Sequence, residues 1–166
     1  IYWYGDIDVE NASAYYEGRY HKLTADFSHV RYWTDWNLRL EAHAQLANRD
    51  LDGSERFYLG GMNTVRAYPA SELSGDIGYN ATLELRRRTD IEGLEVAAFV
   101  DIGEVLLAKS ANEHEKLAGW GLGLRYSKPN DWYAQFDYAW KIDGHEYQSE
   151  DHDHNGRMWF QLYKMF

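Results

Sequence analysis

Apolar and polar residues alternate with a period of two through most of this chain. In residues 132–142 the even positions are all apolar or aromatic, whereas the odd positions are mostly polar. Residues 38–47, 79–86 and 94–102 repeat this pattern. Because successive side chains of a β-strand point to opposite faces, such alternation predicts strands with one apolar face and one polar face.

Four further stretches complete an all-β prediction, the first two with weaker alternation. They are residues 2–9, 20–30, 117–126 and 157–166. Together with the clear strands they make about eight, and each is close to the roughly 9–11 residues that a tilted strand needs to cross a membrane.

The connections between these strands alternate in length. The short connections are residues 34–37, 89–93 and 127–131. The long connections are residues 10–18, 48–78, 104–115 and 143–156. Short turns at one rim and long loops at the other are typical of an outer-membrane barrel, with the turns in the periplasm. A soluble β-sandwich also alternates, but it does not normally place such large aromatic residues on the solvent face. The pattern therefore favours an antiparallel transmembrane β-barrel.

The composition narrows the function. Aromatic residues make up 16% of the chain, with 14 Tyr and 7 Trp, and these two types favour membrane interfaces. The sequence contains no run of about 18 apolar residues, so it predicts no transmembrane helix. The net charge of -10 argues against nucleic acid as a partner, since phosphate binding needs a basic face. The absence of Cys excludes disulfides, thiol catalysis and cysteine-zinc sites.

No pattern in the sequence indicates catalysis. Neither a Ser-His-Asp arrangement nor a Gly-x-Ser-x-Gly motif is present, so we expect no enzyme activity and no cofactor. The last long connection combines three histidines with four carboxylates: His145, His152, His154, Glu146, Glu150, Asp151 and Asp153. Such residues can bind a divalent metal, but no rigid ligand spacing is visible. A solvated acidic loop is the favoured interpretation.

The longest connection carries the most informative motif. Val65, Arg66, Ala67 and Tyr68 follow a lead-in at residues 54–61. The loop leaves through Gly75 and Asp76 and enters the strand at residues 79–86. A second motif, Phe99-Val100-Asp101-Ile102-Gly103, stands at the right place downstream, and a glycine-rich strand follows at residues 119–124. The sequence resembles the two-partner secretion transporters of the haemolysin activation/secretion family, most specifically over residues 51–126.

This resemblance implies a fold. Residues 1–166 are expected to supply the C-terminal part, about eight strands, of a roughly sixteen-stranded barrel. The loop at residues 48–78 is expected to fold into the lumen, and the family's periplasmic POTRA domains are expected to be absent from this chain.

The resemblance also implies a function and partners. The expected function is translocation of a partner exoprotein, of the haemolysin or adhesin type, across the outer membrane of a Gram-negative bacterium without nucleotide hydrolysis. Beyond this exoprotein cargo, the expected partners are outer-membrane lipid and the barrel-assembly machinery. The terminal Phe166 resembles the sorting signal that this machinery reads.

The candidate site joins the two motifs. Asp101 shares the polar face of its strand with Phe99 and Gly103, so it is expected to point into the lumen. In the resembling family the loop arginine contacts the inner wall, and a guanidinium can grip one carboxylate through two parallel hydrogen bonds. The resemblance therefore favours a contact from Arg66 to Asp101. Glu84, on the polar face of its own strand, is a second possible acceptor. From the residues alone, a solvated Arg66 and a generic lumen charge at Asp101 remain the alternative.

Glycines surround this candidate site. Gly60, Gly61 and Gly75, with Asp76, form the expected base of the loop, and Gly61 and Gly103 would allow the loop to approach the wall closely. Gly119, Gly121 and Gly123 share one face of their strand. They either bend the strand or leave room for the loop, and the sequence does not separate these interpretations.

Three rival functions share parts of this pattern. The first is a barrel-protein insertase, which the lead-in at residues 54–61 argues against. The second is a plain porin or a small eight-stranded barrel, whose lumen is filled by side chains and would not admit a loop of about thirty residues. The third is a soluble β-sandwich binding module.

Overall fold

Strands dominate the structure. The computed structural model describes residues 2–13, 19–106, 114–128, 131–142, 149 and 154–164, with side chains from residue 21 onward. Eight strands form one sheet in the order β1-β2-β3-β6-β7-β8-β9-β10. Their bounds are β1 Tyr2–Ser13, β2 Arg19–Tyr32, β3 Trp36–Ala47, β6 Ile77–Arg88, β7 Leu94–Leu106, β8 His114–Lys128, β9 Trp132–Lys141 and β10 Gly156–Lys164. The all-β class and the eight predicted wall strands are confirmed.

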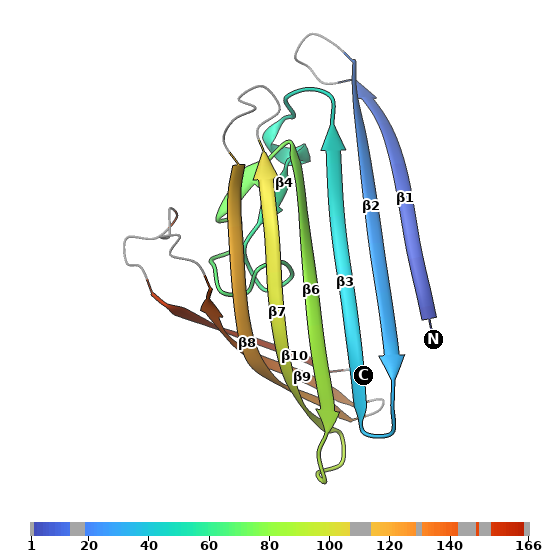
Figure 1. Cartoon of the computed structure of the whole chain (residues 1–166), viewed down its shortest axis with the longest axis vertical. Coiled ribbons are helices and arrows are strands. Elements are labelled where there is room, and N and C mark those ends of the chain that lie inside the picture. Colours follow the sequence, from blue (N-terminus) through green and yellow to red (C-terminus); the bar gives the residue numbers. More distant parts are fainter. Residues whose placement is uncertain are drawn as a thin grey trace.

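The sheet is antiparallel, curved and open. Every neighbouring pair is antiparallel, and Figure 1 shows β9 and β10 turning away behind the lower ends of β6 to β8. Within the described residues, β1 and β10 each pair with a single neighbour. The sheet therefore curls like part of a barrel wall without closing on itself.

The strands run further than their alternation indicates. β1 extends to Ser13, β7 extends to Leu106 and β8 begins at His114. The connections expected at residues 10–18 and 104–115 are therefore strand at their ends, and their middle parts lie outside the described residues. Backbone pairing continues past the last apolar residue because ladder hydrogen bonds do not depend on side-chain polarity.

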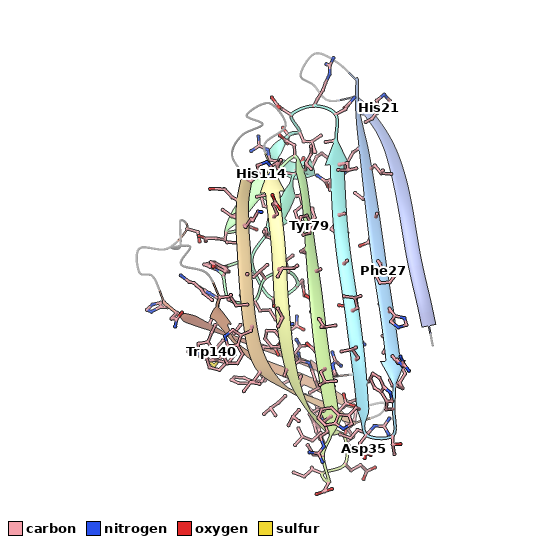
Figure 2. All side chains as sticks on the ribbon, in the orientation of Figure 1. His21, Phe27, Asp35, Tyr79, His114 and Trp140 are labelled. Atoms are coloured by element: carbon pink, nitrogen blue, oxygen red, sulfur yellow. The ribbon has the colours of Figure 1, made fainter. Side chains whose placement is uncertain are left out.

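The two ends of the strands differ as the connection lengths predict. Figure 2 shows Asp35 at the end with the short turns, which we call the short-turn edge, and His21 and His114 at the opposite end. Residues 33–35 connect β2 to β3, and residues 89–93 connect β6 to β7. At the latter turn Gly93 has a φ of 79°, which favours glycine.

The outer face of the sheet is apolar and exposed. Each of the following is more than a third exposed: Leu83, Leu85, Val96, Val100, Ile102, Trp120, Leu122 and Leu124. The register places Leu83, Val100 and Trp120 side by side across β6, β7 and β8. Trp120 also stacks on Trp140 of β9, with ring centroids 4.7 Å apart. So continuous an apolar surface is rare on a monomer in water and indicates that something apolar covers it.

One long connection lies on the inner face. This inner loop, residues 48–76, joins β3 to β6 and contains a 3-10 turn at Gly53–Glu55 and two short paired strands, β4 Phe57–Leu59 and β5 Leu73–Gly75. Both strands contact β7, and Figure 1 shows the loop descending behind β6 and β7. In the part of the chain that the structure describes, no helix is long and apolar enough to cross a membrane.

The hydrophobic core lies between this loop and the wall. The loop contributes Phe57, Leu59, Val65, Ala67, Tyr68 and Leu73. The wall contributes Phe99, Val105, Leu117 and Ala139. A single curved sheet has no second sheet to pack against, so the inner loop supplies the apolar layer that covers part of its inner face.

Candidate functional site

The inner loop begins and reverses with defined local structure. The Ser54 N–H and hydroxyl donate to the Asp52 carboxylate, at 3.1 and 3.0 Å, and this hydrogen bonding lowers the pKa of Asp52. Further along, Gly60 and Gly61 have φ values of 102° and 104°, a backbone conformation that side chains disfavour. A Cβ atom on Gly60 would also collide with the Pro69 carbonyl oxygen. The loop can therefore turn back sharply at this point.

The predicted motif forms the turn that follows. The Tyr68 N–H donates to the Val65 carbonyl at 3.2 Å, and the Gly61 N–H donates to the Tyr68 carbonyl at 3.1 Å. Val65, Ala67 and Tyr68 are fully buried. Apolar residues on both sides thus fix the backbone of Arg66 and direct its side chain at the wall.

Arg66 grips Asp101 of β7 with a two-pronged contact. Its Nε donates to Asp101 Oδ2 and its Nη2 donates to Asp101 Oδ1, both at 2.9 Å. The Arg66 main-chain N–H adds a third bond to Oδ2 at 3.1 Å. The guanidinium carbon also lies 3.2 Å from the centre of the Phe99 ring. The two parallel hydrogen bonds to Asp101 and the contact with the Phe99 ring together fix both the position and the plane of the guanidinium.

Two more carboxylates complete the surroundings of Arg66. Its Nη1 donates to Glu84 Oε2 of β6 at 2.9 Å and to Asp137 Oδ2 of β9 at 3.4 Å. We refer to Glu84, Phe99, Asp101 and Asp137 as the socket. Glu84 lies on β6, Phe99 and Asp101 lie on β7, and Asp137 lies on β9, so Arg66 ties the loop to three strands of the wall.

The wall provides its own cations. Arg125 of β8 donates to Glu84 Oε2 at 2.9 Å and to Asp137 Oδ1 at 2.7 Å. Arg86 donates from Nε to Glu84 Oε1 at 2.5 Å. Three guanidinium groups thus meet three carboxylates, and the formal charge of the cluster is zero. Charges buried this deeply require such pairing, because their desolvation is costly.

The cluster is dry. Asp101 and Asp137 are 0% exposed, and Arg66 is 4% exposed. The Thr82 hydroxyl donates to Asp101 Oδ1 at 2.9 Å, and the Gln135 amide donates to Asp137 Oδ2 at 2.7 Å. These contacts satisfy the remaining acceptor positions of the carboxylates.

Three glycines of β8 leave space for neighbouring side chains. This contact pattern supports the interpretation that they make room for the loop, over the alternative that they only bend the strand. A Cβ atom on Gly119 would lie 2.6 Å from Cβ of Ala67 in the loop. On Gly121 it would collide with the Phe99 ring, and on Gly123 with Asp137. Gly119 thus leaves room for the loop itself, whereas Gly121 and Gly123 leave room for the socket beneath it.

The base of the loop is held separately. The Asp76 N–H donates to the Leu106 carbonyl at 2.9 Å, and Asp76 Oδ1 accepts from the Leu51 N–H at 2.8 Å. A Cβ atom on Gly75 would lie 2.6 Å from the Leu106 carbonyl oxygen, so only glycine fits against the end of β7. Gly103 meets Leu59 of β4 rather than Arg66, and its place is under the short loop strand.

The structure brings most of the predicted site residues together. Val65, Arg66, Ala67 and Tyr68 lie against the wall, and Glu84, Phe99 and Asp101 surround the arginine. Phe166 lies outside the described residues, as do His145 and His152. His154 is exposed, and among the described residues no group of three or more potential metal ligands occurs.

Sequence reasoning missed six contributors: Thr82, Arg86, Arg125, Gln135, Asp137 and Trp159. The indole N–H of Trp159 donates to the Arg66 carbonyl. Arg125 shares its strand face with the β8 glycines, and Asp137 lies on the predicted polar face of residues 132–142. These positions indicate the face of the sheet but not how far along the strand each residue lies relative to the Arg66 cluster. That position is set by the register between neighbouring strands.

Comparisons with known proteins identify the family of this chain. The model of the family described as haemolysin secretion/activation protein ShlB/FhaC/HecB matches residues 2–126. The heme/hemopexin transporter protein HuxB of Haemophilus influenzae is 24% identical over 170 aligned residues, covering 88% of this chain and 29% of HuxB. The solved structure of CdiB from Acinetobacter baumannii is similar, with a TM-score of 0.65 and 25% identity, covering 88% of this chain and 28% of that one. The chain thus spans less than a third of the length of these relatives. It belongs to the haemolysin secretion/activation family.

Proposed function

We propose that this chain is part of an outer-membrane transporter that passes a partner exoprotein to the cell surface, with the inner loop as the plug of its pore. The observation that carries the proposal is the two-pronged contact of Arg66 with Asp101, which holds a long loop against the inner wall. Family membership supports transport, and it favours the secretion branch over a barrel insertase.

The outer face supports a location in the outer membrane. Its apolar residues would face lipid, as the alternate residues of a membrane barrel strand do. The polar inner face would line the pore. A β-sandwich module would instead bury the apolar face under a second sheet, and the loop lies on the opposite face.

The open sheet supports a larger barrel. The edges of β1 and β10 would expose unpaired backbone groups to lipid, which costs several kcal/mol for each group. We propose that these edges pair with further strands of the same protein, giving a barrel of roughly sixteen strands. A wall of that size leaves room for the inner loop, which an eight-stranded lumen does not.

The proposed transport needs no nucleotide. The exported chain would pass unfolded, and its folding outside the cell would supply the direction. The partners in this scheme are an exoprotein of the haemolysin or adhesin type, outer-membrane lipid, and the barrel-assembly machinery during insertion.

Release of the loop is the step that the socket controls. Arg66 cannot leave without exposing Asp101, and breaking a buried ion pair by removal of one partner costs on the order of 3–5 kcal/mol. Water that enters the pore would lower this cost towards 1 kcal/mol or less. The contact is thus strong while the site is buried and weaker once water reaches it.

Secretion measured in cells that carry the intact transporter and its partner tests the proposal. We expect Arg66→Ala to reduce the amount of exoprotein released while the transporter still inserts into the outer membrane. Arg88→Ala removes an exposed arginine at the short-turn edge and is the matched control. Normal secretion by Arg66→Ala would show that the loop contact plays no part in transport.

A further inference from the structure

The socket has the features of a binding site for a guanidinium group. Asp101 accepts two parallel hydrogen bonds from Arg66, Phe99 supplies an aromatic face, and Glu84 accepts a third bond from the remaining nitrogen. A planar guanidinium can satisfy all three at once. A lysine ammonium is a compact point charge that cannot match the fork or stack flat on the ring.

We propose that the socket binds arginine side chains of the exported polypeptide when Arg66 has left it. This inference rests on the proposed function, because the loop must withdraw for the socket to open. The ligand is then supplied by another chain, and the socket selects it by the same chemistry that holds Arg66.

The charges of the wall favour this exchange. When Arg66 leaves, Glu84 and Asp137 keep their hydrogen bonds to Arg125. Among the contacts of the described residues, Asp101 keeps only the Thr82 hydroxyl. The open socket, counted together with Arg86 and Arg125, therefore carries one excess negative charge, and that charge lies on Asp101.

A cavity lies beside the Arg66 side chain, which covers this carboxylate. A space of about 380 Å³ adjoins Arg66 and is lined by Arg39, Met62, Thr82, Glu84 and Arg125 among others. Arg39, near the start of β3, places it on the side of the short turns. That is the side from which an exported chain would arrive, and an extended chain in the cavity could present one side chain to the socket.

The consequence is competition between loop and cargo. While an arginine of the exported chain occupies the socket, Arg66 cannot return and the loop stays displaced. Once that segment has moved on, the empty socket attracts Arg66 again. The pore would thus remain open only while polypeptide fills it.

Peptide binding to the full-length transporter in detergent tests the inference. The probe is a fluorescent, extended peptide of Gly, Ser and Asn with one arginine, compared with the same peptide carrying one lysine. For Arg66→Ala, we expect the arginine peptide to bind about tenfold more tightly, a difference of about 1.4 kcal/mol. Ethylguanidinium replaces the side-chain atoms removed by the substitution, so it should displace the peptide at lower concentration than n-butylammonium does.

Two further variants make the outcome decisive. Adding Asp101→Asn to Arg66→Ala should remove the preference for arginine, whereas adding Asp90→Asn, which removes an exposed carboxylate in a turn, should keep it. If the loop of Arg66→Ala stays seated, replacing residues 62–67 by a Gly-Ser linker opens the socket, and the preference should appear there. Equal binding of both peptides in both open variants, or a preference that survives Asp101→Asn, overturns the inference.

The same transporters separate this inference from the proposed function. Reduced secretion by Arg66→Ala without a peptide preference would refute guanidinium selection alone. Normal secretion with a clear preference would refute the plug and leave the binding site.

Discussion

The indole N–H of Trp159 donates a hydrogen bond of 2.7 Å to the main-chain carbonyl of Arg66. The arginine is therefore held through its backbone by β10 as well as through its side chain by the socket. Since the Arg66 N–H also donates to Asp101, both main-chain groups of this residue bind wall residues. The loop tip cannot rotate within the lumen without breaking contacts on two sides.

Removing the indole donor should loosen the loop tip. Trp159→Phe keeps most of the ring and deletes one hydrogen bond, which is worth about 0.5–1.5 kcal/mol. Amide hydrogen exchange of residues 62–68 in the full-length protein measures the change, and we expect faster exchange. Trp36→Phe, at an exposed ring near the short-turn edge, is the control. If both substitutions speed the exchange of residues 62–68 equally, the effect does not come from loss of the hydrogen bond between Trp159 and Arg66.

The contact between Arg66 and Asp101 should be strongly coupled. We expect Arg66→Ala and Asp101→Ala each to lower secretion, and the double variant to lower it little further, because either change already breaks the pair. A double-mutant cycle on exoprotein release measures this coupling. The charge swap Arg66→Asp with Asp101→Arg should restore part of the activity. Simple additivity of the two alanine effects would contradict the role of the pair.

A methyl group on the wall should displace the loop without disturbing the sheet. Gly119→Ala would place Cβ 2.6 Å from Cβ of Ala67, and overpacking of this kind costs about 1–3 kcal/mol. We expect protease cleavage within residues 60–72 of the folded protein to become faster. Ala118→Val enlarges the neighbouring residue on the opposite face and should leave cleavage unchanged. Unchanged cleavage in Gly119→Ala would mean that the loop lies further from β8 than the structure places it.

Single cysteines should distinguish the two faces of the sheet. The chain has no natural Cys, so each introduced thiol reports alone. In outer membranes, Glu41→Cys on the inner face should react with a membrane-impermeant thiol reagent, and Leu83→Cys on the outer face should not. Equal labelling of both positions would rule out a lipid-covered outer face.

Residues 1–166 expressed alone should not form a closed barrel. The unpaired edges of β1 and β10 are not tolerated in lipid. We therefore expect no monomeric species whose electrophoretic mobility in SDS shifts on boiling. A heat-modifiable monomer would show that these eight strands close by themselves.

Much of this fold could be predicted because alternation is a local property. The eight wall strands follow from a period of two, which needs no knowledge of neighbours. The two short strands of the inner loop, β4 and β5, were beyond such reasoning. Three residues are too few to display a period, and these strands exist because Phe57 and Leu73 are buried against the wall.

The candidate site was predictable in part for a related reason. Asp101 was found because a motif in the loop had a matching motif in the wall, and Glu84 was found because alternation places it on the polar face of its strand. Arg125 and Asp137 belong to no such motif, and their position depends on register: Asp137 pairs with Gly123 of β8, which in turn pairs with Ala97 of β7. Only this offset between strands brings Asp137 within reach of an arginine that also binds Asp101.

The contacts of Arg66 join parts of the chain that are far apart. Glu84 lies 18 residues away, Asp101 35, Asp137 71 and Trp159 93. Loop closure costs more chain entropy as the separation grows, and contacts between distant segments form late in folding. We therefore expect the loop to be seated in stages as successive strands join the wall, with the Trp159 hydrogen bond forming only once β10 is in place. A fully seated loop thus requires, during biogenesis, a wall in which β10 is already in place.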